Sequence, residues 1–293
     1  MLPPRGTHHF TRPNVLSVDW PLDPVPLILD SPHSGTTHPP DFKPSVPSAF
    51  LRQGQDSYVD DLYANAPSFG ATFLRALFPR VYVDVNRSAD DLDVGLVDGE
   101  WPSQVSPSEK TALGQGLIWK KCLNGTPIYD KRLSVLEAKA RIDNYYTPYH
   151  QALGSLLEMA YNEFKAVWHI DCHSMPSVSS AICKEGPGHR RSDFTLGDRH
   201  GTSCSSEFTF FVKSVLENLG YAVTINDPYA GVELVRAYSS PAHNRHSLQV
   251  EINRALYMDE TTFAKTDDFQ KLQKNLEVLL GEITNYIRKK INL

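Results

Sequence analysis

Four short apolar runs, each followed by polar residues, are the feature of this sequence that most restricts its fold. They span residues 25–29, 81–85, 166–170 and 248–252, and are rich in Val, Ile and Tyr. Such runs are typical of strands buried in a mostly parallel sheet. Ligands of an open α/β sheet bind at the carboxyl ends of its strands. We therefore predict that the polar ends converge on one cleft: Asp30-Ser31-Pro32-His33, Asn86-Arg87, Asp171-Cys172-His173-Ser174 and Glu251-Ile252-Asn253-Arg254.

Helical patterns and loops occupy much of the remaining chain. Residues 132–163 are rich in helix formers and contain Pro148, which should start a new helix or kink a continuing one. The C-terminus predicts an amphipathic helix, capped by Asp267 or Asp268, because apolar residues recur every three or four positions: Phe269, Leu272, Leu276, Leu279, Ile283 and Ile287. Segments 88–127 and 184–206 are typical of long loops. We expect one α/β domain over residues 1–293, with a mixed, mostly parallel sheet flanked by helices.

Composition and charge exclude several classes of protein. Hydrophobic residues make up 41% of the chain and charged residues 22%, as in ordinary globular proteins. The net charge of -5, with both signs dispersed, lacks the footprint of a nucleic-acid or anionic-membrane binder. The N-terminus MLPPRGTHHF shows no export signal, and the four cysteines form no CxxC pair. We expect a soluble cytoplasmic protein with a small-molecule partner; the oligomeric state stays open.

The segment around His173 concentrates ionisable groups on one side of a predicted strand. A period of two places His169, Asp171 and His173 on one face, and Trp168, Ile170 and Cys172 on the other. His173 is the better candidate for a metal ligand, whereas His169 is equally explained as a structural histidine. Asp171 is placed to hold an imidazole in one tautomer.

Two further segments carry candidate ligands. His33 follows the first apolar run in a turn, where Gly35 permits unusual backbone angles. Asp56 and Asp60 would share a face if their stretch opens a helix. Asp61 is better explained as part of a solvated acidic face.

Eight motifs in order resemble the N-formylglutamate amidohydrolase family. They cover roughly residues 25–260 and read SPHSG, QDSYVDDLY, VYVDVNR, RIDNYYTPYH, HIDCHS, DFTLGDRHGTSC, NDPYAG and QVEINRALYMDE. That family is similar in fold and metal site to the zinc carboxypeptidases and to the succinylglutamate desuccinylase and aspartoacylase group. The resemblance implies a zinc carboxypeptidase-like fold of the phosphorylase/hydrolase type. It also implies an amidohydrolase that acts in histidine degradation.

The resemblance also implies a metal site. It makes His33 the first ligand and His173 the last. Thr36 stands where the carboxypeptidases have their glutamate, so the acidic ligand is assigned to Asp56, with Asp60 as the alternative. Two histidines and a carboxylate leave a fourth position open, as a catalytic Zn²⁺ requires. Another divalent ion remains open, because such ligands select metals weakly.

Catalytic and substrate-binding residues follow from the same relatives. Glu251 matches their general base, although an ion pair with Arg254 or Arg245 would also explain it. Asn86 and Arg87 resemble the pair that binds a substrate carboxylate, for which a guanidinium fork is well suited.

Arg141 lies in a helical motif of the family. It is a candidate for binding the second carboxylate or the developing oxyanion, and is equally explained as an exposed helical arginine.

The expected reaction is zinc-dependent hydrolysis of N-formyl-L-glutamate, or of a related small N-acyl amino acid. It would give formate and L-glutamate, with Glu251 moving the proton. Two alternatives stay open: a zinc carboxypeptidase acting on peptides, and a catalytically silent protein that binds a small acid.

Overall fold

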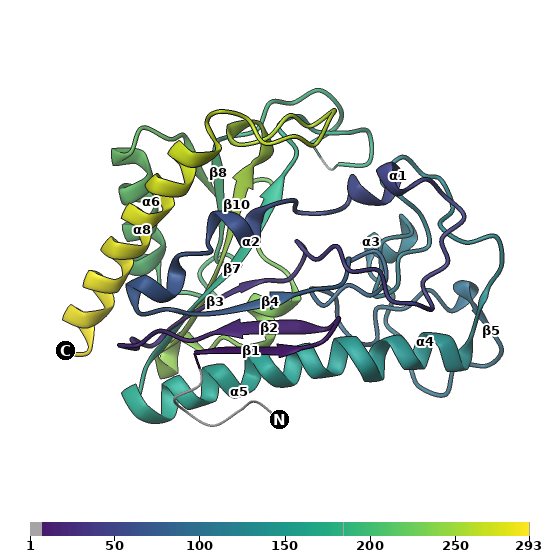
Figure 1. Cartoon of the computed structure of the whole chain (residues 1–293), viewed down its shortest axis with the longest axis horizontal. Coiled ribbons are helices and arrows are strands. Elements are labelled where there is room, and N and C mark those ends of the chain that lie inside the picture. The colour runs from purple at the N-terminus through teal and green to yellow at the C-terminus, as the bar shows by residue number, and fades with distance from the viewer. Residues whose placement is uncertain (1–7, 184, 293) are drawn as a thin grey trace.

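The computed structural model, which describes residues 8–183 and 185–292, is built around an eight-stranded mixed sheet (Figure 1). The strand order is β1-β2-β4-β3-β7-β10-β8-β9. β4, β3, β7 and β10 are parallel, whereas β1, β2 and β8 pair antiparallel with their inner neighbours. The bounds are β1 His9–Arg12, β2 Leu16–Asp19, β3 Leu27–Ser31, β4 Thr72–Ala76, β7 Val167–Met175, β8 Phe194–Gly197, β9 Val223–Ile225 and β10 Arg245–Asn253. The predicted α/β class with a mostly parallel centre is confirmed.

β7 and β10 form the longest strand pair. All nine residues of β7 are buried, and Glu251 of β10 is the register partner of His173. Trp168, Ile170 and Cys172 join one apolar core, as the period of two predicted. The opposite face of both strands carries the polar residues.

Helices cover both faces of the sheet. One face packs against α4 (Val135–Arg141) and α5 (Thr147–Phe164), which a π-helical segment, Ile142–Tyr146, joins into one helix along the bottom of Figure 1. Pro148 thus lies in the first turn of α5 and does not end the helix.

The other face packs against α2 (Val59–Leu62), α6 (Ser206–Asn218) and α8 (Phe269–Lys290). All six predicted apolar positions of α8 are buried. Asp268 is its N-cap residue, but the side chain makes no capping hydrogen bond. Within the described chain, no helix is both long and apolar enough to cross a bilayer.

Shorter elements complete the fold. A second sheet pairs β5 (Val97–Asp98) with β6 (Leu133–Ser134). The short helices are α1 Ser48–Arg52, α3 Glu109–Ala112 and α7 Glu233–Ala237, and the 3-10 turns are Ala66–Phe69, Val94–Leu96, Pro241–His243 and Arg254–Leu256.

The prediction of a strand at 81–85 is wrong. The segment is buried, but its backbone makes turns, in which Tyr82 N donates to Pro79 O and Arg87 N to Asp84 O; Asp84 N donates to the distant Leu117 O. A short apolar run shows burial without specifying the conformation. The segment 184–206 is not all loop either, because it contains β8. Position 184, and residues 1–7 of the N-terminus considered above, lie outside the described residues.

Candidate metal centre and active-site pocket

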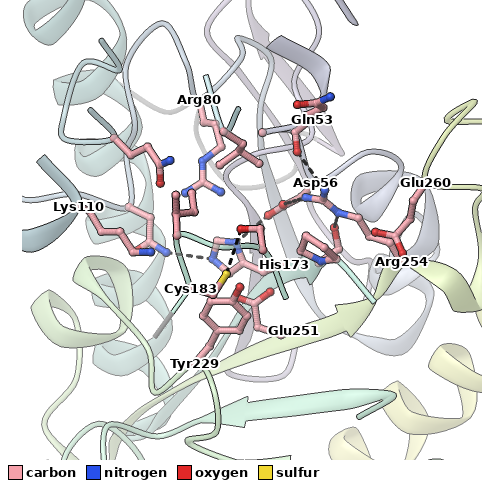
Figure 2. Close-up of a pocket in the computed structure, with 18 of the residues that line it drawn as sticks. Gln53, Asp56, Arg80, Lys110, His173, Cys183, Tyr229, Glu251, Arg254 and Glu260 are labelled. Atoms are coloured by element: carbon pink, nitrogen blue, oxygen red, sulfur yellow. Dashed lines mark hydrogen bonds and ion pairs between the residues drawn. The ribbon is translucent and has the colours of Figure 1, made fainter. Parts of the chain in front are cut away.

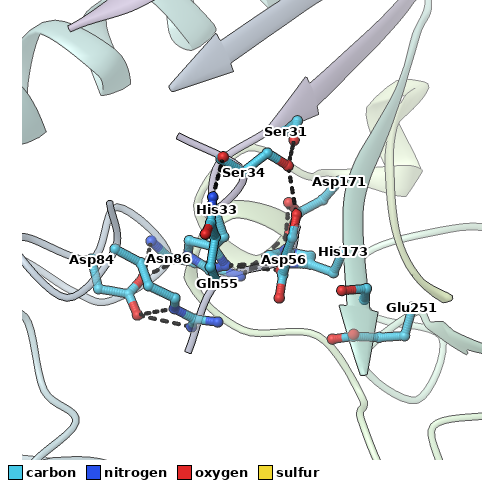
Figure 3. A network of polar contacts seen from close by, with 12 residues as sticks. Ser31, His33, Ser34, Gln55, Asp56, Asp84, Asn86, Asp171, His173 and Glu251 are labelled. Carbon is cyan, nitrogen blue, oxygen red and sulfur yellow. Dashed lines mark hydrogen bonds and ion pairs between the residues drawn. The ribbon is translucent and has the colours of Figure 1, made fainter. Parts of the chain in front are cut away.

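Three side-chain atoms from distant parts of the chain face one point beside the end of β7 (Figure 3). His33 Nδ1 lies 3.2 Å from His173 Nδ1 and 3.4 Å from Asp56 Oδ2, and His173 Nδ1 lies 3.0 Å from that oxygen. Tetrahedral zinc sites with bonds of about 2.0–2.1 Å separate their ligand atoms by about 3.3 Å. All three residues are buried. The structure therefore brings together the residues proposed as ligands, at the spacing of tetrahedral corners.

A carboxylate lies behind each imidazole. His33 Nε2 is 2.8 Å from Asp84 Oδ1, and His173 Nε2 is 2.8 Å from Asp171 Oδ1. Carboxylates only accept hydrogen bonds, so a neutral imidazole that keeps its proton on Nε2, toward its carboxylate, has a lone pair on Nδ1. Two lone pairs and a carboxylate oxygen then face one another. Such a donor set fits a metal cation, since without a positive charge between them the three atoms would repel.

Asp84 was not identified as a site residue from the sequence. Its carboxylate accepts hydrogen bonds from Nε and Nη2 of Arg80 and from Nε1 of Trp119, and also contacts His33. Burial alone would raise the pKa of Asp84, but Arg80 and His33 lower it well below its usual range. The sequence feature that could have identified Asp84 is its position in the motif VYVDVNR, two residues before Asn86.

Asp56 is held in place from several sides. Its backbone N donates to His33 O, and Ser34 Oγ donates to its carbonyl oxygen. Arg254 Nη2 donates to Oδ1 at 3.0 Å, leaving Oδ2 toward the imidazoles. Burial would raise the pKa of Asp56, yet the neighbouring His173, His33 and Arg80 lower it well below its usual range. Asp56 is thus an anion suited to a metal ion.

The alternative ligand Asp60 lies outside this cluster. Residues 56 and 60 do not share a helical face, because α2 begins only at Val59, and burial raises the pKa of Asp60. Asp61 is exposed and pairs with Lys265, which agrees with its prediction as part of a solvated acidic face.

His169 belongs to a separate buried network. Its Nε2 lies 2.9 Å from Asp30 Oδ1 and its Nδ1 2.6 Å from Ser247 Oγ, while Tyr149 donates to Asp30. The structural explanation of His169 therefore fits its surroundings.

Gly35 serves a different purpose from the one predicted. Its φ is not among the positive values in the described chain, but an added Cβ would lie 2.4 Å from the carbonyl carbon of Leu77. The turn after β3 needs glycine because the backbone of residues 77–78 packs against it.

A pocket of about 540 Å³ opens beside the three ligand candidates (Figure 2). Asp56, His173 and Glu251 lie in its wall, together with charged groups that include Arg80 and Arg87. Burial raises the pKa of Glu251 to about 7; His173 opposes this shift and Asp56 adds to it. A carboxyl group with such a pKa can both accept and return a proton near neutral pH.

The predicted substrate-binding residues have different surroundings. Arg87 lines the pocket, donating to the carbonyl oxygens of Gln115 and Asn86. Asn86 also lines the pocket, but its amide is engaged: Nδ2 donates to Asp171 Oδ2, and Oδ1 accepts from Leu234 N. Asn86 thus helps to hold the carboxylate that lies behind His173.

Arg141 does not line this pocket. Its side chain is 1% exposed, donates to Tyr82 O and Tyr129 Oη, and stacks over the Tyr82 ring. The prediction that it binds substrate or stabilises the oxyanion needs correction, because aromatic residues enclose the guanidinium away from the cleft.

Comparison with known proteins gives consistent results. The family model for N-formylglutamate amidohydrolase matches residues 25–258. The N-formylglutamate deformylase of Pseudomonas aeruginosa is 28% identical over 244 residues, covering 80% of this chain and 83% of the relative. The Pseudomonas putida deformylase is 27% identical over 247 residues, covering 81% and 83%. The crystal structure of N-formylglutamate amidohydrolase from Ralstonia eutropha JMP134 superposes with a TM-score of 0.90 at 43% identity, covering 95% of this chain and 100% of that one.

Proposed function

This chain belongs to the N-formylglutamate amidohydrolase family, and from that membership we propose that it hydrolyses N-formyl-L-glutamate to formate and L-glutamate. One observation carries the proposal for this chain: Nδ1 of the buried His33 converges with Nδ1 of His173 and Oδ2 of Asp56, and His173 and Asp56 line one pocket together with Glu251.

His33, Asp56 and His173 would hold the metal ion. Zinc is the ion we propose, because nitrogen and oxygen donors at tetrahedral spacing suit it; other divalent ions also bind such ligands. When bound, zinc would polarise the formyl carbonyl and lower the pKa of a water molecule toward about 7. Asp84 and Asp171 keep both imidazoles oriented with Nδ1 toward the ion.

Glu251 moves the proton. As the register partner of His173, it stands at the same end of the sheet as the ligand candidates. It takes a proton from the attacking water as the oxygen bonds to the formyl carbon. It returns that proton to the nitrogen as the C–N bond breaks, so that formate and L-glutamate leave.

The arginines of the pocket divide into two groups by their hydrogen bonds. In Arg254 and Arg191 every side-chain nitrogen already has a partner. Arg80 donates through Nε and Nη2, and Arg87 through Nε and Nη1. Within the described chain, Arg80 Nη1 and Arg87 Nη2 have no acceptor. These two terminal nitrogens could therefore donate hydrogen bonds to an anionic ligand.

We assign Arg87 to a substrate carboxylate and Arg80 to the developing oxyanion. The positive charge of Arg80 lies near enough to Asp56 and Glu251 to lower the pKa of both. Preorganised donors at that position stabilise charge that appears only in the transition state. Arg87 makes no ion pair with any described carboxylate, which leaves its charge to the substrate.

Formate release from N-formyl-L-glutamate tests this proposal, with N-acetyl- and N-succinyl-L-glutamate and a short peptide as competitors. We expect the formyl substrate to give the highest kcat/KM. Preferred cleavage of the peptide would indicate a carboxypeptidase instead. Saturable binding of every compound without turnover, in protein loaded with zinc, would indicate a binding protein.

A further inference from the structure

Gln249 has a buried oxygen with no partner. Gln249 lies on β10, on the same face as Glu251, and lines the pocket. Its side chain is 2% exposed, and its Nε2 donates to Glu251 Oε1 at 2.9 Å. No donor reaches its Oε1 from the residues that the structure describes.

The orientation of this amide follows from its neighbour. Turning the amide over would bring Oε1 against the oxygen of an ionised Glu251, so the hydrogen bond keeps Nε2 on that side. A buried acceptor without a donor is unfavourable and is rare in native proteins. Some donor present during the reaction would therefore satisfy Gln249.

We propose that Gln249 Oε1 accepts the N–H of the scissile amide, an inference that rests on the proposed function. Glu251 returns a proton to that nitrogen, so its carboxylate must come within hydrogen-bonding distance of the nitrogen. The Gln249 amide is hydrogen-bonded to the same carboxylate, and would therefore lie near that nitrogen as well.

The contact would favour bond breaking as well as binding. As the C–N bond breaks, the nitrogen takes up a proton, and the positive charge that develops on it makes its N–H groups better donors. An acceptor fixed beside it is therefore more favourable in the transition state than in the ground state. Gln249 would thus orient Glu251 through Nε2 and select secondary amides through Oε1.

N-formyl-N-methyl-L-glutamate provides the test, because it lacks only the N–H. We expect wild-type enzyme to prefer N-formyl-L-glutamate in kcat/KM, and Gln249→Met to reduce that preference by about tenfold or more. Methionine has a similar shape, but its sulfur is only a weak acceptor. Gln249→Glu is the matched control: it keeps an oxygen acceptor, so the N–H preference should stay within about threefold of wild type while both rates fall.

The ratio of the two substrates separates this role from simple support of Glu251. A displaced Glu251 would slow both substrates equally, so an unchanged preference in Gln249→Met would overturn the inference alone. If Gln249→Met does not fold, equal kcat/KM values for both substrates in wild-type enzyme, or loss of the preference in Gln249→Glu, would overturn it. A wild-type enzyme that hydrolyses neither compound would overturn the proposed function as well.

Discussion

At the scale of single residues, the candidate centre depends on carboxylates that are not ligands. Asp84 and Asp171 are fully buried, and each lies against the Nε2 of one imidazole. Asp84 is in turn held by Arg80 and Trp119. The orientation of the ligands is therefore fixed by groups behind them.

We predict that Asp84→Asn weakens zinc binding by about ten- to a hundredfold, the usual effect of losing such support. Asparagine still accepts from His33, but it has no charge to hold Arg80. Zinc affinity measured against a chromophoric chelator checks this, with Asp61→Asn as an exposed control that should not change it. Equal affinities for the two variants would show that Asp84 does not support the metal.

We predict that Glu251→Gln lowers kcat by at least about a hundredfold and leaves zinc bound. The amide cannot take up the proton of the attacking water, and general acid–base groups contribute about 10²–10⁴ in rate. His173→Ala should remove both zinc and turnover. Metal analysis and formate release on the same samples check both variants, and near-normal activity of Glu251→Gln would rule out its role as base.

The sequence identified residues whose type and position both point to metal chemistry, such as His33 and His173. It pointed to Arg141 and missed Arg80, because the sequence does not show which arginine side chain reaches the pocket. Packing decides between them: Arg141 is enclosed by Tyr82 and Tyr129, whereas Arg80 keeps one edge toward the pocket.

At the scale of elements, the pairing of β7 with β10 sets the centre. The parallel register places Glu251 opposite His173, and β3 on the other side of β7 leads to His33. The apolar pattern predicted these three strands. It could not give the turns at 81–87, because the segment is also held by a backbone hydrogen bond from Asp84 to Leu117, a residue distant in sequence.

Helix α5 carries a histidine that should make stability depend on pH. His150 lies between Tyr146 and Tyr238, and burial lowers its pKa below the usual value. The folded protein then keeps His150 neutral while the unfolded chain gains a proton as the pH falls through about 6.5. The stability associated with this group is therefore present above that pH and decreases below it.

We predict that His150→Gln loses less stability than wild type between pH 7 and pH 5. The substitution removes the titrating group, whereas its packing cost is the same at both pH values. Urea unfolding at the two pH values measures the difference. A decrease equal to that of wild type would show that His150 titrates alike in both states.

At the scale of the whole molecule, one sheet separates two apolar cores and carries the site at the carboxyl ends of its central strands. The polar face of β7 and β10 lies on the side of α5, while their apolar face packs against α6 and α8. The α/β class was predictable because strand and helix periodicities differ. The outer strands β1, β2 and β9 were not, since each has only three or four residues.

Removal and return of the metal test the central claim most directly. We predict that protein treated with a chelator loses formate release from N-formyl-L-glutamate, and that about one zinc ion per chain restores it. His33→Ala and Asp56→Ala treated in the same way should bind no zinc at that concentration and stay inactive. Full turnover by protein shown to be free of metal would contradict the proposal that His33, Asp56 and His173 form a catalytic metal centre.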